Sequence, residues 1–172
     1  MQPDLDNVKK RLDGSRDFVD KLLAKVPGFT GYFEKGAMYE ADRIIRNFTA
    51  ERLLTLKRDI SAVMSETVQK GDKSALSDLD SLNTVLERIY KKVKNADYTT
   101  SASFSRAQIT QDDNNRLLEY DWRLITGLDE VEAMVKKMKE AFTADQIKPV
   151  RLKVEDFEKS FDDRKNVILE VI

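Results

Sequence analysis

Hydrophobic residues recur along this chain at steps of three and four, the spacing that places side chains on one face of an α-helix. The first such stripe breaks only at Ser15. Its helix is expected to end at Pro27-Gly28, because the residue before proline avoids the helical region and glycine accepts a positive φ. The hydrophobic members of this stripe are Leu5, Val8, Leu12, Val19, Leu22 and Val26.

Two longer stripes follow the loop after Pro27. The first predicts a helix over about 34–69, which the sequence Lys70-Gly71-Asp72 is expected to stop. The second predicts a helix over about 73–95, with the unbroken stripe Leu76, Leu79, Leu82, Leu86, Ile89 and Val93. The stretch 97–109 is rich in Ser and Thr and has no clear period, so it is expected to be the longest loop.

Two capping motifs predict where the last helices begin. Thr110-x-x-Asp113 resembles a capping box with Asp in place of Glu, and the stripe after it runs to about residue 142. Thr143-x-x-Gln146 is a fuller capping box. The stripe that follows contains Ile147, Val150, Val154, Phe157, Phe161, Ile168 and Val171.

These stripes predict an all-α fold: an antiparallel bundle of about five long amphipathic helices, packed like a coiled coil, in one domain over 1–172. The segment 143–172 is also a candidate for a separately docked helix, because four earlier helices could already close a bundle. Residues 150–154 alternate like a strand. A strand needs a partner, and only 167–172 offers one, so the sequence favours a helix there.

Composition removes several classes of chemistry. Cysteine and histidine are both absent, which excludes disulfides, thiolate or imidazole metal ligands and histidine-activated nucleophiles. The 30 basic and 31 acidic residues nearly cancel, so no nucleic-acid partner is expected. No run of about 18 apolar residues predicts a transmembrane segment, and the acidic start lacks the apolar region of a signal peptide. We therefore expect a cytoplasmic protein without a cofactor.

The turn over 26–32 is the most unusual local stretch. Its Gly28, Thr30, Gly31 and Tyr32 form a candidate functional loop, because two glycines and a threonine before a helix could hold a phosphate at the helix N-terminus. The loop lacks the Lys-Ser/Thr pair of a P-loop and the strand that should precede one. The favoured interpretation is a tight turn between helices, with Tyr32 and Phe29 covering the end of the bundle.

Two groups of cations lie near predicted helix C-termini, where positive charge complements the helix dipole. They could hold phosphate or acidic lipid, but no aromatic residues are interleaved with them, so helix-end stabilisation is the favoured interpretation. The two groups are Arg88, Lys91, Lys92 and Lys94, and Lys136, Lys137 and Lys139.

Carboxylates offer the only route to an enzyme. Asp112 and Asp113, with Glu119 and Asp121, invite a Mg²⁺ site, because Mg²⁺ is often held by one or two carboxylates and a substrate phosphate. Capping explains Asp112 and Asp113 more simply. The one-turn pair Asp129/Glu132 does not point along an apolar face. No catalytic, cofactor-binding or metal-binding residue is assigned.

Two charged residues each interrupt an apolar stripe. Arg52 lies between Phe48 and Leu56, and Asp121 lies on the stripe that includes Leu117 and Leu124. An unpaired buried charge is very costly, so we expect the two to form a structural ion pair, with Arg46 as the fallback partner of Asp121. The alternative is that both reach solvent at the edge of the bundle.

Three stretches together resemble a known family: 26–32, Ala41-Asp42-Arg43-Ile44-Ile45-Arg46 and Leu118-Glu119-Tyr120-Asp121. The family consists of uncharacterised helical proteins of bacteria and archaea. Its members carry a Pro-Gly-x-x-Gly-Tyr turn, an Ala-Asp-x-x-x-Arg helix start and a Tyr-x-x-Asp segment. The resemblance covers about 15–135 and departs after Tyr98, where Thr-Thr-Ser-Ala-Ser stands in place of aromatic and glycine residues. It implies helical architecture and no activity.

The sequence favours a non-enzymatic helical interaction or scaffold protein, with a protein partner or a second copy of itself. The alternative is a carboxylate and Mg²⁺-dependent enzyme that handles phosphates or nucleotides. A buried group of three or more carboxylates in a cleft would favour the alternative.

Overall fold

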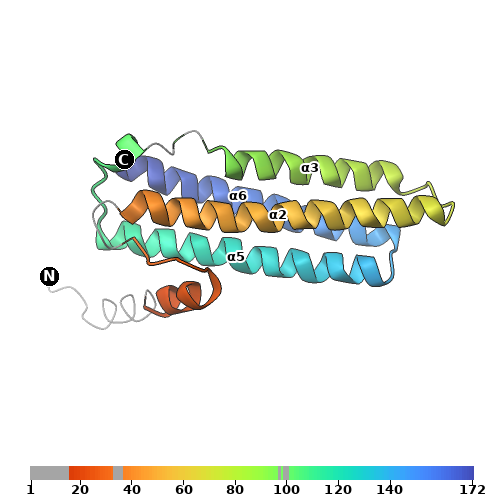
Figure 1. The fold of residues 1–172 in the computed structure, drawn as a ribbon, viewed down its shortest axis with the longest axis horizontal. Coiled ribbons are helices and arrows are strands. Elements are labelled where there is room, and N and C mark those ends of the chain that lie inside the picture. Colours follow the sequence, from red (N-terminus) through yellow and green to blue (C-terminus); the bar gives the residue numbers. More distant parts are fainter. Residues whose placement is uncertain (1–15, 33–36, 97, 99–100) are drawn as a thin grey trace, which may run out of the picture. The chain divides into compact units, whose positions relative to one another are not determined.

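The computed structural model describes residues 16–32, 37–96, 98 and 101–172, and this part of the chain is all-α (Figure 1). Helices make up 83% of it and it contains no strand, which confirms the predicted fold class. Residues 16–25 are helical, whereas Leu5, Val8 and Leu12 lie outside the described residues. The later elements are α2 (Ala37–Gln69), α3 (Leu76–Lys94), α4 (Ser101–Phe104), α5 (Gln111–Glu140), a 3₁₀ turn η1 (Ala144–Gln146) and α6 (Ile147–Val171).

The end of α2 lies where the sequence predicts it. Gly71 adopts a positive φ of 77°. Its N–H donates to the carbonyl of Val68, and the N–H of Asp72 donates to the carbonyl of Thr67. These two bonds form a Schellman motif, which satisfies the last carbonyls of the helix and needs a residue that tolerates the left-handed region.

The helix α3 begins three residues later than the predicted start at Lys73. The carboxylate of Asp72 accepts hydrogen bonds from both the backbone N–H and the hydroxyl of Ser74, at 3.0 and 2.7 Å. Such a local bond offers the backbone an alternative to the helix. The chain therefore turns at 72–75 before α3 starts at Leu76.

Both predicted capping motifs carry bonds that start their helices. Asp113 accepts from the backbone N–H and the hydroxyl of Thr110, and the Asp113 N–H donates to the Thr110 hydroxyl at 3.2 Å. Gln146 accepts from the backbone N–H of Thr143 at 2.9 Å. Residues 150–154 lie inside α6, as the preferred interpretation expected.

The expected loop over 97–109 was wrong in part, because the short helix α4 lies within it. Phe104 at the end of α4 is buried, and its ring meets Tyr39 of α2 edge to face at 5.8 Å between centroids. This ring contact anchors α4, whose sequence has no hydrophobic period.

The expected single domain divides into two compact units. The division falls inside α2, α5 and α6, so each of these helices gives one segment to each unit. Unit 1 combines Met1–Ile45, Asp97–Arg123 and Asp163–Ile172, and unit 2 combines Arg46–Ala96 and Leu124–Asp162.

Unit 2 is a bundle of α3 with segments of α2, α5 and α6 (Figure 1). Ion pairs between neighbouring helices define its topology. Contacts of α2 with α3, and of α5 with α6, run antiparallel, as expected of helices joined by short links. Two successive ion pairs show that α2 and α5 run parallel, Arg52–Glu132 and Asp59–Lys139, and two show the same for α3 and α6, Arg88–Glu158 and Lys92–Asp162. The four contacts are Lys57–Glu87, Lys153–Glu130, Lys139–Asp59 and Arg88–Glu158.

The interior of unit 2 is one hydrophobic cluster, drawn from the predicted stripes of all four helices. The α6 positions Val150, Val154, Phe157 and Phe161 are buried in it. Within unit 2, the stripe proposed for a separately docked helix is therefore covered by the chain's own helices.

Unit 1 packs the helix 16–25 and its following turn with α4 and segments of α2, α5 and α6. Its interior is mixed. Leu117, Leu118 and Ile168 are fully buried, but so are charged residues of α2, α5 and α6. The buried charged or amide residues of unit 1 are Asp42, Asn114, Asp121 and Arg164.

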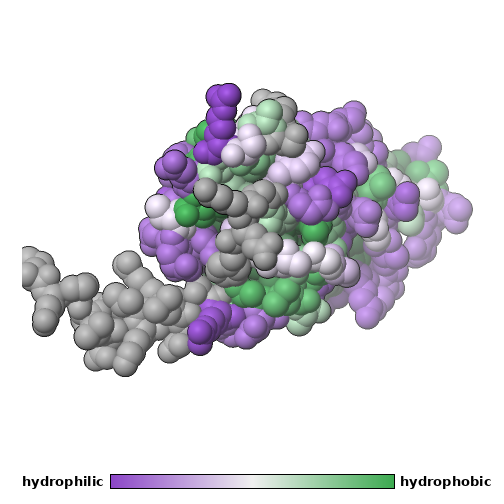
Figure 2. Space-filling view, turned by 60° about the vertical axis from the view of Figure 1, so that its left-hand side comes forward, coloured by the Kyte–Doolittle hydropathy of each residue, from purple (hydrophilic) through white to green (hydrophobic). Residues whose placement is uncertain are grey.

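Hydrophilic residues, in purple, cover much of the face shown in Figure 2, and hydrophobic residues, in green, form separate patches. In the described part of the chain, no helix is long and apolar enough to cross a membrane. Among the described residues, the large hydrophobic side chains that stay exposed are Leu23, Val68, Leu152 and Leu169.

Candidate functional site

The most unusual constellation is a buried guanidinium in unit 1. Arg164 of α6 is fully buried. Its Nε donates to Oδ1 of Asp121 on α5 at 2.5 Å, and its Nη1 donates to Oδ1 of Asp42 on α2 at 2.7 Å. Both carboxylates are also fully buried. One side chain thereby joins three helices through charge-assisted hydrogen bonds, the strongest class that proteins form.

Two tyrosine hydroxyls complete this group, which we call the buried polar cluster: Arg164, Asp42, Asp121, Tyr32 and Tyr98. Nη2 of Arg164 donates to the Tyr32 hydroxyl at 3.0 Å, and Nη1 lies 3.5 Å from the Tyr98 hydroxyl. The Tyr32 hydroxyl in turn donates to Oδ2 of Asp121. Asp121 therefore accepts at both of its oxygens.

The turn over 26–32 delivers Tyr32 to this cluster. Gly28 and Gly31 have positive φ values of 80° and 83°, which explains why glycine occupies both positions. Phe29 and Tyr32 are buried, and their rings meet edge to face at 5.6 Å. This geometry agrees with a tight turn between helices. Thr30, the one hydroxyl of the candidate phosphate loop besides Tyr32, is exposed.

The electrostatics of the cluster follow from its burial. Burial raises the pKa of the Asp121 carboxyl above its usual range, while the charge of Arg164 and the hydrogen bond from Tyr32 oppose the rise. Burial also raises the pKa of the Tyr32 hydroxyl well above its usual range, against the opposing charge of Arg164. For Arg164, burial lowers the pKa, but the surrounding carboxylates outweigh it and the net pKa is raised. The guanidinium thus stays charged.

The buried polar cluster is closed to solvent, which limits what it can do. Arg164, Asp42 and Asp121 expose none of their side chains, so no substrate reaches their atoms in this conformation. Directional bonds from a single guanidinium do fix the relative register of the segments that carry its partners. The geometry is that of an alignment device.

The predicted pair of Arg52 with Asp121 is wrong, and each residue has other partners. Arg52 in unit 2 binds Glu132 of α5 through Nε at 2.7 Å and Nη2 at 2.9 Å, and it binds Asp129 at 2.6 Å. The fallback residue Arg46 donates to backbone oxygens of α3, those of Val93 and Lys94. The Asp129/Glu132 pair, considered for Mg²⁺, instead binds the Arg52 guanidinium. We call this set of contacts the Arg52 fork.

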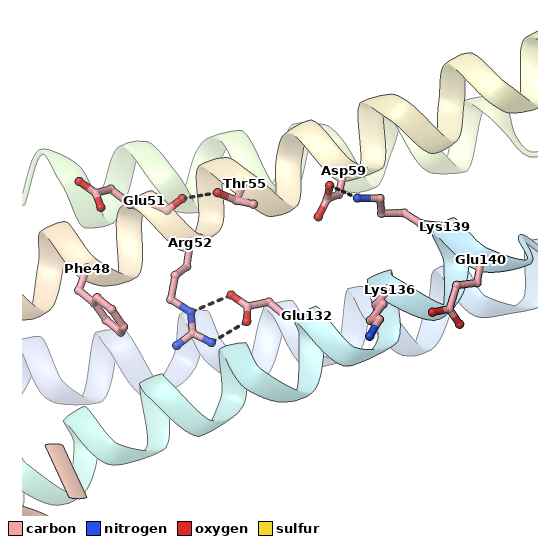
Figure 3. A pocket seen from close by; sticks show the side chains of 9 residues that line it. All are labelled: Phe48, Glu51, Arg52, Thr55, Asp59, Glu132, Lys136, Lys139 and Glu140. Atoms are coloured by element: carbon pink, nitrogen blue, oxygen red, sulfur yellow. Dashed lines mark hydrogen bonds and ion pairs between the residues drawn. The ribbon is translucent and has the colours of Figure 1, made fainter. Parts of the chain in front are cut away.

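The Arg52 fork forms one wall of an open groove between α2 and α5 of unit 2, with a volume of about 800 Å³ (Figure 3). Phe48 lies at one end, with its ring 5.4 Å from the Arg52 guanidinium. At the other end Lys139 bonds to Asp59 at 2.7 Å. We call this the α2–α5 groove. Its lining residues are Phe48, Glu51, Arg52, Thr55, Asp59, Glu132, Lys136, Lys139 and Glu140.

Three charges of the α2–α5 groove have no ion-pair partner within the described residues. Lys136 follows Glu132 by one helical turn, but both Glu132 oxygens already accept from Arg52. Glu51 and Glu140 are exposed at the two ends. The groove therefore offers one ammonium and two carboxylates to a surface that could complement them.

The predicted basic groups are mostly engaged inside the chain. Arg88 and Lys92 of α3 bind Glu158 of α6, and Lys92 also binds Asp162 at 2.7 Å. Lys91 pairs with Glu87 on its own helix at 3.0 Å. These contacts tie α3 to α6, which explains the group over 88–94 without a phosphate.

The predicted acidic candidates are likewise separated. Asp113 caps α5, Glu119 pairs with Arg123 at 2.6 Å, and Asp121 lies in the buried polar cluster. Across the residues that the structure describes, no group of three or more acidic side chains is arranged to hold a metal ion. The fold therefore keeps Asp113, Glu119 and Asp121 in separate environments.

Arg164 is the residue that sequence reasoning missed, although a signal for it exists. The hydrophobic stripe of α6 runs through Phe157 and Phe161 to Ile168. Arg164 fills the step between the last two, so it is a charged residue on the buried face. This is the same anomaly that singled out Asp121.

No family model, curated protein or solved structure matches this chain.

Proposed function

We propose that this protein is a non-enzymatic helical interaction protein, whose unit 2 presents the outer face of α2 and the α2–α5 groove to a protein partner. The observation that carries the proposal is the distribution of charged side chains. Those in deep positions bind one another within the chain, whereas the α2–α5 groove keeps Lys136, Glu51 and Glu140 without ion-pair partners.

Bonds between α2 and α5 hold the α2–α5 groove in one geometry. The Arg52–Glu132 bonds join α2 to α5 along one wall of the groove, and the Lys139–Asp59 bond joins them at its end. A preorganised surface loses less entropy on binding than one that must first order its side chains. Polar groups around a half-buried aromatic residue such as Phe48 also resemble the composition of transient interfaces.

The alternative, an enzyme that uses carboxylates and Mg²⁺, has less support. Two of the carboxylates considered for the Mg²⁺ site already bind cations of the same chain: Asp121 binds Arg164, and Glu132 binds Arg52. A metal ion would have to displace a guanidinium from each site.

Membership of the bacterial and archaeal helical family is proposed on its motifs, and the meeting of Tyr32, Asp42 and Asp121 at Arg164 gives those motifs one common structural role.

Site-specific photo-crosslinking in the native cell tests the interaction. The photoreactive residue p-benzoylphenylalanine replaces Lys136 in the α2–α5 groove, Ser65 on the outer face of α2, or Lys159 on the exposed face of α6 as a matched control. We expect discrete crosslinked proteins from Lys136 or Ser65 and none from Lys159. The same weak products from all three positions would contradict the proposal.

A second assay addresses the enzymatic alternative. The full chain is incubated with Mg²⁺ and a panel of nucleoside di- and triphosphates, and released phosphate is measured beside the variant Glu132→Gln. We expect no release above the blank. Turnover that Glu132→Gln abolishes would favour the enzyme instead.

A further inference from the structure

The segment over 16–32, which we call the arm, is held in unit 1 by few side chains. It consists of the helix 16–25 and the turn that follows. Apart from Gly31 and four buried side chains, its residues are exposed or half-buried. The arm therefore packs with one face only, as an amphipathic surface segment does. The four buried side chains are Leu22, Val26, Phe29 and Tyr32.

Polar contacts tie the arm to α5 and α6. Nζ of Lys21 lies 5.6 Å from the centre of the Trp122 ring on α5. The Tyr32 hydroxyl accepts from Nη2 of Arg164 at 3.0 Å and donates to Oδ2 of Asp121. We call the surface beneath the arm, which includes Trp122, Asp121 and Arg164, the seat. The Tyr32 hydroxyl thus holds the arm on its seat by directional bonds to two different helices.

Separating the arm from its seat should cost less than opening unit 2. The interior of unit 2 is one hydrophobic cluster, so opening it exposes apolar surface to water. Beneath the arm, by contrast, undocking returns water to the Asp121 carboxylate and the Arg164 guanidinium, which recovers part of their desolvation cost. An amphipathic helix takes most of its stability from the face that it packs, so the undocked arm should also uncoil.

The arm itself shows which kind of segment fits the seat. It presents two hydrophobic side chains one helical turn apart, Leu22 and Val26, and then the rings of Phe29 and Tyr32 from the turn. Proteins commonly recognise a partner helix by such a hydrophobic face. The Tyr32 hydroxyl adds selectivity, because a segment without it leaves Oδ2 of Asp121 without this donor. A second segment of the same pattern would make the same contacts.

We propose that the arm is an intramolecular ligand of unit 1, which undocks as one unit and is displaced from its seat by a partner segment of the same pattern. That segment has two hydrophobic residues four apart, a Pro-Gly turn, an aromatic residue and a tyrosine, in the order in which the arm has them. The docked arm keeps the seat covered until the partner binds. This interaction lies in unit 1, so it goes beyond the surface of unit 2 in the proposed function.

Native-state hydrogen exchange of the full chain tests the undocking. The amides of Val26 and Phe29 donate within the arm, at 2.8 and 3.2 Å, so they should exchange when the arm undocks and uncoils. We expect the arm to exchange at least about tenfold faster than 114–121 of α5 and 79–89 of α3, with a weaker dependence on urea. Equal exchange of the arm and the α5 segment, with the same urea dependence, would overturn the proposal.

The variant Tyr32→Phe measures how strongly the hydroxyl holds the arm. It keeps the ring and removes the two hydrogen bonds, so exchange of the arm should rise by about a further tenfold while that of α3 stays the same. Tyr90→Phe, on α3 and outside the buried polar cluster, is the matched control and should leave the arm unchanged. An equal rise in exchange throughout the chain would indicate global destabilisation and overturn this role of Tyr32.

Binding of the arm as a separate peptide tests the seat. In the full-chain variant Leu22→Asp, a charge at a buried position should keep the chain's own arm undocked. The probe is a fluorescein-labelled peptide of residues 16–32, and the control peptide has Tyr32→Phe. By fluorescence anisotropy, the probe should bind Leu22→Asp at least about tenfold more tightly than it binds the parent chain, whose own arm competes. The control peptide should bind the variant about threefold or more weakly than the probe.

Three outcomes would contradict the proposal. Circular dichroism should show that Leu22→Asp keeps most of its helix, so unfolding of the whole variant would mean that the arm is an integral part of the fold. A folded variant that binds the probe no better than the parent does would mean that the seat accepts no second segment. Sedimentation that shows a dimer of the parent chain, dissociated by Leu22→Asp, would assign the seat to the arm of a second copy and exclude a separate partner.

Discussion

The interiors of the two units differ in chemistry: that of unit 2 is hydrophobic, whereas that of unit 1 contains buried charges. Unit 2 is built on one hydrophobic cluster, and its ion pairs lie at half-exposed edges, as the Lys57–Glu87 and Arg52–Glu132 pairs do. Unit 1 instead places Arg164, Asp42 and Asp121 where no solvent reaches them. Hydrophobic packing is strong but not directional, whereas a buried guanidinium is satisfied in few geometries.

Each kind of interaction suits the segments that it joins. Unit 2 has long regular helices, whose repeated stripes give many contacts that agree on one register. Unit 1 must join short pieces from distant parts of the sequence, among them the turn over 26–32 and the residue Tyr98. For such pieces we infer that the buried polar cluster specifies alignment more than it adds net stability, because desolvation offsets much of the attraction.

Replacing Arg164 should have the largest effect. In Arg164→Met, two buried carboxylates lose their guanidinium, which should lower the free energy of unfolding by roughly 3–5 kcal/mol. Trp122, the one tryptophan of the chain, lies in unit 1, so urea denaturation followed by its fluorescence measures the change. A loss below about 1 kcal/mol would mean that solvent reaches the cluster.

A hydrophobic truncation should affect unit 2 almost as strongly. Leu86 is fully buried in its cluster, so Leu86→Ala should cost about 2–5 kcal/mol through lost burial and the cavity left behind. Leu86→Met, which nearly conserves volume, should cost less than about 1.5 kcal/mol. Denaturation followed by circular dichroism measures both. Similar losses from the two variants would indicate that shape, rather than burial, dominates there.

Asn114 offers a gain in stability within unit 1. It is 3% exposed, and among the residues that the structure describes neither polar atom of its side chain has a hydrogen-bond partner. Asn114→Leu removes this unsatisfied group, so we expect the free energy of unfolding to rise by about 1–3 kcal/mol. Thermal unfolding of the two proteins checks the sign. A destabilised variant would show that a water or ligand normally satisfies the amide.

Tyr32 should make stability fall in alkali. Its pKa is raised in the folded state, so above about pH 10 the unfolded chain releases a proton that the folded chain keeps. Stability from this group is complete below pH 10 and declines above it by at most about 1.4 kcal/mol per pH unit. Tyr32→Phe should lose this slope in urea denaturation between pH 8 and 11. Tyr90→Phe, outside the buried polar cluster, is the control and should keep it.

Arg52 should show the smallest effect. Its partners Asp129 and Glu132 have side chains that are 35% and 40% exposed, so they are rehydrated when the guanidinium is removed. Arg52→Met should therefore cost about 1 kcal/mol or less. Measured beside Arg164→Met, this variant gives the contrast between a half-exposed and a buried arginine. Equal losses would remove the distinction between the two units.

Much of the local structure was readable from the sequence, for reasons that are local themselves. Gly71 stops α2 because the left-handed region favours glycine, and Thr110 with Asp113 starts α5 because both groups lie within one turn. The stripe of α3 predicted its buried face, with Leu79, Leu82 and Leu86 all in the core. α4 was not predicted, since its order depends on one ring contact with another helix.

Local sequence patterns alone predicted that the chain is helical, where most helices begin and end, and that Arg52 and Asp121 need partners. The identity of those partners depends on the packing of the helices. In unit 2 the parallel contact of α2 with α5 brings Arg52 to Glu132, and in unit 1 the end of α6 brings Arg164 to Asp121. Helical period fixes which face a side chain lies on. It does not fix which helices are neighbours or how far one is shifted along the other, because many long-range contacts together set that register.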